Sequence, residues 1–174
     1  MVVLTMGGPP GAGKSDVSKL LAKRLNLKYY SVGMFFREKA KEAGVEFNEF
    51  LKTAPEGLHL EADKHCDDVS KQGNVIIDGR LAAYMAKTVN FKIFLTAPLE
   101  IRGTRVAQRN QVPVSEATAK IKERYALVIK DIKNIYDIDI RDLKIYDVVL
   151  NTEFFGLNDV VDVLEKVVRT GMKL

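Results

Sequence analysis

Short, mostly apolar runs alternate along this chain with longer stretches in which apolar residues recur every three or four positions. The short runs are predicted to form strands at residues 2–6, 27–31, 75–77, 91–95 and 148–150. The longer stretches have the spacing of amphipathic helices, and the helix predicted at the C-terminal end carries an apolar face from Val160 to Val168. Strands that alternate with such helices are typical of a parallel sheet covered on both faces. The pattern therefore predicts an α/β fold with a five-stranded parallel sheet.

Two polar, helix-prone stretches are too long to be simple connections between strands. One covers residues 35–72 and is interrupted at Gly44 and at residues 55–57, and the other covers residues 109–142. Long excursions from a sheet often serve as substrate-binding flaps or lids. We expect a helical flap over about residues 35–72 and a short lid over about residues 109–125, both within one domain that spans residues 1–174.

Composition narrows the class of protein. The chain has 174 residues, of which 47% are hydrophobic, and a formal net charge of +4 that is spread along its length. This mild charge suits a protein that handles small anions and does not by itself indicate nucleic acid. The single Cys66 excludes an intrachain disulfide, and no apolar run approaches the roughly 18 residues needed to cross a membrane. We expect a cytoplasmic monomer that binds neither nucleic acid nor membranes.

The strongest chemical signal is a glycine-rich segment between the first predicted strand and the helix after it. Its sequence fits G-x-x-x-x-G-K-[ST], in which backbone N–H groups and the start of a helix surround phosphate oxygens. A plain glycine turn is the alternative interpretation. The residues predicted to bind ATP are Gly8, Pro9, Pro10, Gly11, Ala12, Gly13, Lys14, Ser15 and Asp16.

Within this loop, two side chains have distinct predicted roles. We expect Lys14 to reach the β- and γ-phosphates of ATP and the Ser15 hydroxyl to coordinate Mg²⁺. Asp78 ends the third predicted strand, where its carboxylate would lie beside the loop and could also hold Mg²⁺. A turn formed by Asp78 and Gly79 is the competing explanation.

A missing carboxylate indicates which type of phosphoryl acceptor to expect. An alcohol acceptor usually needs a positioned base, whereas a phosphate monoester is already anionic and nucleophilic near neutral pH. The segment after the second predicted strand contains no acidic residue before Glu38 but does contain Arg37, and Arg80 follows the third strand. Both guanidinium groups could hold a phosphate through paired hydrogen bonds, although surface helix charges are the alternative.

A further set of arginines follows the fourth predicted strand. Arg102, Arg105 and Arg109 fall on one face of a helix without an acidic residue between them on that face. We expect Arg105 and Arg109 to close on the ATP phosphates, neutralise charge during transfer and help to exclude water. A solvated helix face is the alternative.

With these residues in view, the chain resembles the nucleoside monophosphate kinases, and most closely the archaeal-type cytidylate kinases. The resemblance covers nearly the whole chain and is carried by the phosphate-binding loop and by the segments at residues 31–38, 78–82 and 138–152. It implies a P-loop kinase fold and ATP- and Mg²⁺-dependent phosphorylation of CMP or dCMP. The acceptor-binding residues that it implies are Ser31, Gly33, Phe36, Arg37, Asp78 and Arg80, and the catalytic residues are Lys14, Arg105, Arg109 and Arg124.

Two positions depart from the family pattern. Asp131 stands where these kinases usually carry an arginine, which is expected near the acceptor phosphate or base, and Asp137 replaces a usual glycine. His59, His65 and Cys66 lack the spacing of a zinc site and are predicted to be ordinary helix residues.

Two other functions stay open from the residues alone. One is an adenylate kinase or another small P-loop kinase, and the other is a nucleotide-dependent switch or assembly protein. Two separate sets of arginines favour transfer between two bound phosphates over simple switching, but they do not identify the acceptor base.

Overall fold

A parallel sheet of five strands forms the centre of the computed structural model, which describes residues 1–173. The strand order is β2-β3-β1-β4-β5, and every neighbouring pair is parallel. Each strand lies within one residue of its predicted bounds, so the predicted α/β fold is confirmed. The strands are β1 (Val3–Gly7), β2 (Lys28–Ser31), β3 (Val75–Asp78), β4 (Phe91–Thr96) and β5 (Val148–Asn151).

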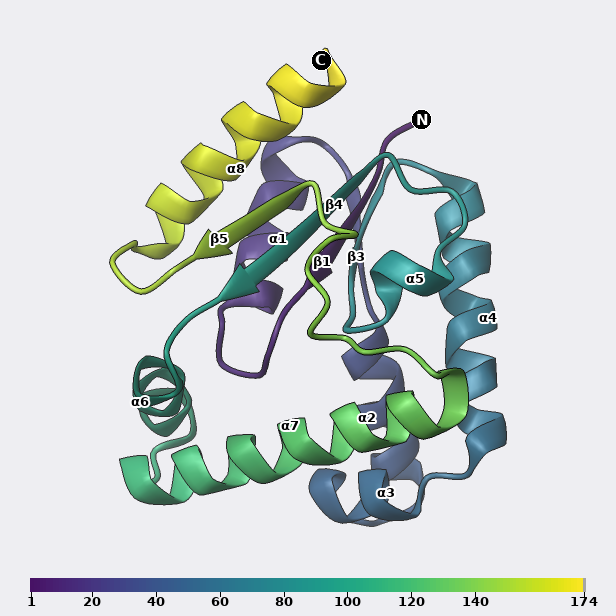
Figure 1. Ribbon diagram of the computed structural model, residues 1–174, viewed down its shortest axis with the longest axis vertical. Coiled ribbons are helices and arrows are strands. Elements are labelled where there is room, and N and C mark those ends of the chain that lie inside the picture. Colours follow the sequence, from purple (N-terminus) through teal and green to yellow (C-terminus); the bar gives the residue numbers. More distant parts are fainter. Residues whose placement is uncertain (174) are drawn as a thin grey trace.

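Helices cover both faces of the sheet, as the apolar character of the strands predicts (Figure 1). Helices α1 and α8 pack on one face, and α4 and α5 pack on the other. The helices are α1 (Lys14–Arg24), α2 (Val32–Glu42), α3 (Phe47–Thr53), α4 (Glu56–Gln72), α5 (Ala82–Met85), α6 (Leu99–Asn110), α7 (Val114–Tyr136) and α8 (Leu157–Met172).

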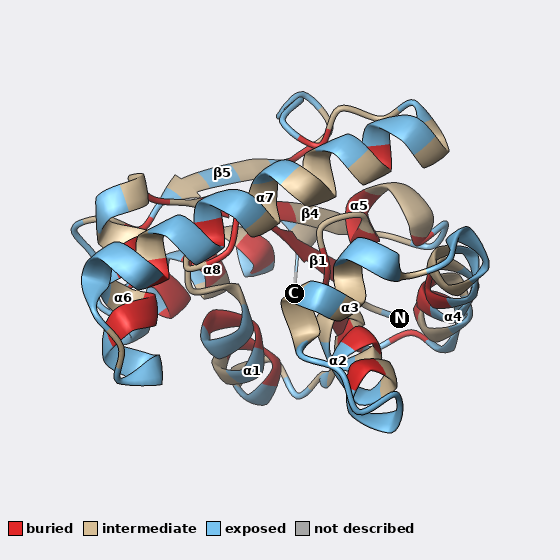
Figure 2. Ribbon diagram, turned by 90° about the horizontal axis from the view of Figure 1, so that it is seen from below, coloured by how far each residue is buried: buried red, intermediate tan, exposed pale blue. Residues whose placement is uncertain are grey.

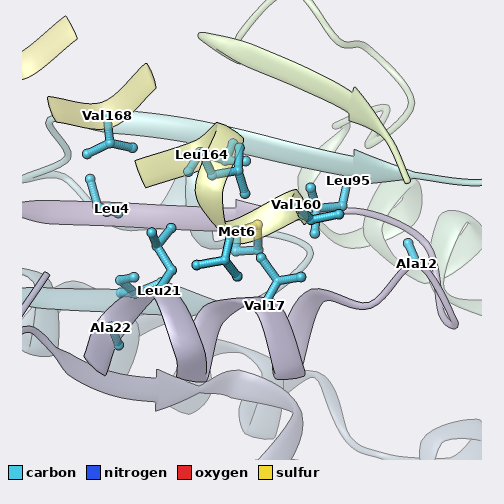
Figure 3. Close-up of a cluster of buried hydrophobic side chains, with 13 residues drawn as sticks. Leu4, Met6, Ala12, Val17, Leu21, Ala22, Leu95, Val160, Leu164 and Val168 are labelled. Carbon is cyan, nitrogen blue, oxygen red and sulfur yellow. The ribbon is translucent and has the colours of Figure 1, made fainter. Parts of the chain in front are cut away.

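The larger core cluster fills the space between α1, α8 and the sheet. Leu4 and Met6 point from β1 toward Leu21 of α1 and Leu164 of α8, and all four side chains are fully buried (Figure 3). A second cluster around Cys66 lies under α4 and α5. Buried residues gather in inner strands such as β1, whereas β5 and most of α7 are exposed or only partly buried (Figure 2). This rigid centre fixes where the ends of the strands lie.

Two groups of helices extend beyond the carboxyl ends of the strands (Figure 1). One consists of α2 and α3 with the first part of α4, and the other is the packed pair α6 and α7. Helix α2 ends before Gly44, which has a φ of +67°, so the chain is interrupted there as predicted. The second interruption ends at Pro55 rather than at residue 57, because Glu56 and Gly57 already belong to α4. The later part of α4 belongs to the sheet packing, because its Cys66 is buried against β3. The part of residues 35–72 that overhangs the strand ends is therefore shorter than the whole segment.

The structure gives a physical account of Asp137. This residue follows the last turn of α7 and has a φ of +57°, the left-handed conformation that commonly ends a helix and favours glycine. Aspartate tolerates that conformation better than most residues, and its carboxylate also pairs with Lys133 one turn earlier. The replacement of glycine thus keeps the end of the helix in place.

Within residues 1–173, no helix combines the length and the apolar character that crossing a membrane would need.

Candidate active site

The loop between β1 and α1 wraps closely against its neighbours, which explains its glycines. Gly8 has a φ of +137°, and a Cβ atom there would lie 2.1 Å from the Leu95 carbonyl oxygen. Gly11 has a φ of +83°, and its Cβ would lie 2.8 Å from the Cβ of Arg102. Only glycine fits both positions without displacing the backbone. The loop therefore turns tightly and leads directly into the first turn of α1.

Asp78 and Ser15 meet at the edge of the sheet. Because β1 and β3 are adjacent and parallel, with Met6 opposite Asp78, the end of β3 lies beside the loop. Ser15 Oγ donates a hydrogen bond of 2.6 Å to Asp78 Oδ2, which also accepts one of 3.2 Å from the Tyr29 hydroxyl. A hydroxyl and a carboxylate are hard oxygen ligands of the kind that Mg²⁺ prefers. The chemistry of these two side chains therefore fits a magnesium ion.

Lys14 lies among several positive charges. Its Nζ donates a hydrogen bond of 2.9 Å to the Pro9 carbonyl oxygen. Burial is the largest effect on this ammonium group and lowers its pKa to about 7; Asp78 opposes the change, and nearby Arg80 and other arginines add to it. A pKa lowered in this way indicates a site where a negative ligand would be strongly favoured.

Three arginines from different helices and loops converge next to the phosphate-binding loop. Arg37 and Arg124 lie over the ring of Phe47, with 5.0 and 5.8 Å from the guanidinium carbon to the ring centroid. The Nε atoms of Arg80 and Arg124 are buried and have no hydrogen-bond partner among residues 1–173. Burial, followed by the charges of Arg80, Arg37 and Arg109, lowers the pKa of Arg124 to about 9. Buried guanidinium groups without partners need an anion close by.

One cavity of about 530 Å³ connects these parts. Its lining includes the loop residues from Pro10 to Asp16, the group of three arginines, and side chains from α2, α3, α4, α6, α7 and α8. Most of the other predicted binding and catalytic residues also line this cavity. They are Ser31, Gly33, Phe36, Arg37, Asp78, Arg80, Arg105, Arg109 and Arg124. Gly8 and Pro9 do not line it; both are buried behind the loop, where Pro9 accepts the hydrogen bond from Lys14.

Comparisons with known proteins identify the family. The model of the cytidylate kinase-like family matches residues 60–153. A cytidylate kinase of Pyrococcus horikoshii is 43% identical over 155 residues, which cover 87% of this chain and 80% of that protein. The cytidylate kinase of Methanocaldococcus jannaschii is 37% identical over 175 residues, which cover 96% and 97% of the two chains. The chain belongs to the cytidylate kinase-like family.

Solved structures agree on the fold of this cytidylate kinase-like protein. A protein of Eubacterium ventriosum superposes with a TM-score of 0.75 at 17% identity and covers 98% of this chain and 99% of its own. The shikimate kinase of Acinetobacter baumannii superposes with a TM-score of 0.64 at 14% identity, and the superposition covers 98% of this chain and 94% of the shikimate kinase. Identities this low support the kinase fold and nothing more specific.

The arginines of α6 have neutral partners that were not foreseen. Arg102 donates to the carbonyl oxygens of Ala97 and Pro10, at 2.9 and 3.1 Å. Arg105 donates to the hydroxyl and carbonyl oxygens of Thr152, at 2.8 and 2.6 Å. Oxygen atoms of neutral residues therefore already pair with Arg102 and Arg105, which the sequence did not predict. Arg109 is exposed on the cavity wall and donates only to Asn110 among the described residues.

Sequence reasoning missed several side chains of this cytidylate kinase-like site. Phe47 on α3 supports the guanidinium groups of Arg37 and Arg124. Asp63 on α4, Leu127 on α7 and Phe155 after β5 also line the cavity. Asp131, noted only as a departure, also lines it, and so does His59. For Asp131, the sequence did contain a signal. It follows Arg124 by seven residues, which is two helical turns, so both side chains lie on the same face of the helix.

Zinc has no support in residues 1–173, which contain no cluster of three His, Cys, Asp or Glu side chains suited to a metal ion. Cys66 is buried, and burial raises the pKa of its thiol to about 12.

Proposed function

We propose that this protein transfers the γ-phosphoryl group of ATP to CMP or dCMP, with Mg²⁺ held by Ser15 and Asp78. The observation that carries the proposal is one continuous cavity that is lined both by the phosphate-binding loop and by a separate group of three arginines. One nucleotide would place its phosphates on the loop, and the other would place its phosphate against Arg37, Arg80 and Arg124. Membership in the cytidylate kinase-like family supports CMP as the acceptor.

The proposed reaction needs no general base. An oxygen of the acceptor phosphate attacks the γ-phosphorus of ATP, and the bond from that phosphorus to the β–γ bridging oxygen breaks, so that ADP leaves. The acceptor oxygen carries no proton at neutral pH, because the second pKa of a phosphate monoester is about 6. The reaction therefore depends on bringing two anions together and on stabilising the charge between them.

Each group of cations has a separate task in this scheme. Arg37, Arg80 and Arg124 would neutralise and orient the acceptor phosphate. A side chain at Gly33 would crowd Arg37, because its Cβ would lie 3.3 Å from Arg37 Nη1. Lys14 would exchange the Pro9 carbonyl for oxygens of the β- and γ-phosphates. Bound Mg²⁺ would supply charge neutralisation on the same phosphates.

The helix α6 would contribute on the donor side. Arg102 already fixes the loop through the Pro10 carbonyl, and Arg105 fixes α6 to the end of β5 through Thr152. Arg109, at the far end of α6, would contact the transferred phosphoryl group and help to exclude water. Exclusion of water matters because water would otherwise hydrolyse ATP.

A panel of acceptors tests the proposal directly. ADP release from ATP and Mg²⁺ is measured with CMP, dCMP, UMP, AMP or GMP, and CMP and dCMP are expected to give the highest kcat/KM. Lys14→Ala should lower kcat/KM by about 1,000-fold, since it removes a charge that stabilises the transition state.

Lys23→Ala is the matched control, because Lys23 is an exposed lysine near the end of the same helix. It should keep the activity of the unaltered protein. Slow ATP hydrolysis that no monophosphate accelerates would instead support a nucleotide-dependent switch, and preferred use of AMP would support an adenylate kinase.

A further inference from the structure

Besides the arginines, the cavity is lined by two carboxylates that belong neither to the phosphate-binding loop nor to the end of β3. Asp131 on α7 and Asp63 on α4 both line it, together with His59, which is one turn before Asp63. Leu127 and Phe36 supply apolar surface beside them. The cavity thus offers a cationic place for phosphate and a separate place with hydrogen-bond acceptors and apolar walls.

The positions along α7 match the dimensions of a nucleotide. Arg124 and Asp131 are two turns apart on one helix face, or about 10 Å along the helix axis. This separation is comparable to the distance from the phosphate of a nucleoside monophosphate to the far edge of its base. A phosphate held by Arg124 would therefore bring the base of the same nucleotide to Asp131.

The two carboxylates are not equally free to bind a ligand. Asp63 Oδ2 accepts a hydrogen bond from the Tyr136 hydroxyl, so that α7 fixes the position of this side chain on α4. Asp131 is partly buried, yet it makes no hydrogen bond or ion pair with another side chain among residues 1–173. A carboxylate in a cavity without such a partner is suited to recognising a donor on the ligand.

We infer that Asp131 determines the choice of base by accepting a hydrogen bond from the exocyclic amine of cytosine, with Asp63 as a second acceptor beside it. This inference rests on the proposed function and adds the residue that distinguishes amino from keto pyrimidines. Carboxylates are suitable partners for the N4 amine of cytosine, and a charged acceptor makes that hydrogen bond stronger. Uracil has a carbonyl oxygen at the same position. This oxygen cannot donate a hydrogen bond to the carboxylate of Asp131, and the two groups would repel each other.

The test compares CMP with UMP as acceptors for the unaltered protein and for Asp131→Asn. The substituted amide has nearly the same shape, can donate to the O4 atom of uracil, and removes the charge that favours the cytosine amine. We expect the ratio of kcat/KM for CMP over UMP to fall by about tenfold or more, mainly through a higher KM for CMP and a lower KM for UMP. Calorimetric binding of CMP and UMP without ATP should give the same change in ratio.

Asp137→Asn is the matched control, since it removes a carboxylate near the same end of α7 but from an exposed residue outside the cavity wall. It should leave the ratio unchanged. A ratio for Asp131→Asn within about twofold of the unaltered protein, with CMP still phosphorylated, would overturn this inference and leave the proposed function intact. An unaltered protein that phosphorylates no pyrimidine monophosphate would instead overturn the proposed function.

Discussion

Lys14 combines two properties that are rarely found in one side chain, a positive charge and surroundings that disfavour it. Its burial and the nearby arginines lower its pKa to about 7, although Asp78 opposes the change. Between this value and the ordinary value of 10.5, the unfolded chain binds more protons at this position than the folded protein does. The free energy of unfolding of the unliganded protein therefore receives a contribution from Lys14 that increases as pH rises through this interval. Bound phosphate would reverse the effect by favouring the charged ammonium group.

This reversal predicts proton uptake when ATP binds. At pH 8.5 unliganded Lys14 is largely neutral, and phosphate oxygens should raise its pKa, so up to about one proton should enter with the nucleotide. Calorimetry in two buffers of different ionisation enthalpy measures that number. Lys14→Met should abolish the uptake and Lys23→Ala should keep it. Equal uptake in the unaltered protein and in Lys14→Met would show that Lys14 is already charged in the free site.

Residues differ in how far their roles could be predicted from sequence. The positions of Lys14, Ser15 and Asp78 at one edge of the sheet could be predicted, because each lies in a short local pattern after a strand. The partners of Arg105 could not, because Thr152 is 47 residues away and only the packing of α6 against the end of β5 brings them together. The same holds for Asp63 and Asp131, which come from helices far apart in the chain.

Among the elements, the strands were the most predictable part, since buried parallel strands need nearly continuous apolar runs. Their order in the sheet was not predicted, because it depends on how the connecting helices cross the sheet. The helices beyond the strand ends were harder to delimit. Helix α4 begins beyond the ends of the strands and ends packed against the sheet. Its apolar spacing does not show at which residue the packing against the sheet begins. Its buried Cys66 marks the part that belongs to the core.

The end of α7 offers a test of how backbone conformation decides a residue. Asp137→Gly should have a free energy of unfolding within about 0.5 kcal/mol of the unaltered protein, because glycine accepts the left-handed conformation and the exposed ion pair with Lys133 contributes little. Asp137→Val removes the same carboxylate but places a β-branched side chain there, which should cost about 1–2 kcal/mol. Urea unfolding compares the three proteins. Equal stability of the valine and glycine variants would contradict the conformational explanation.

Considered as a whole, the protein surrounds one cavity with groups from both overhanging regions. Phe47 on α3 contacts Arg37 of α2 and Arg124 of α7, and Lys52 of α3 pairs with Glu123 of α7 at 3.2 Å. Helices α2 and α3 are thus in contact with α7 beside the cavity. Whether the protein is a monomer stays a prediction from the sequence.

The central claim is that two nucleotides bind end to end in this cavity, with their phosphates between the loop and the three arginines. Binding of adenosine and cytidine joined through a chain of five phosphates tests it most directly. Because one molecule would occupy both places, its calorimetric affinity with Mg²⁺ should exceed that of ATP by about 100-fold or more. Arg80→Ala should remove most of that gain while changing ATP affinity little. An affinity equal to that of ATP alone would contradict the claim.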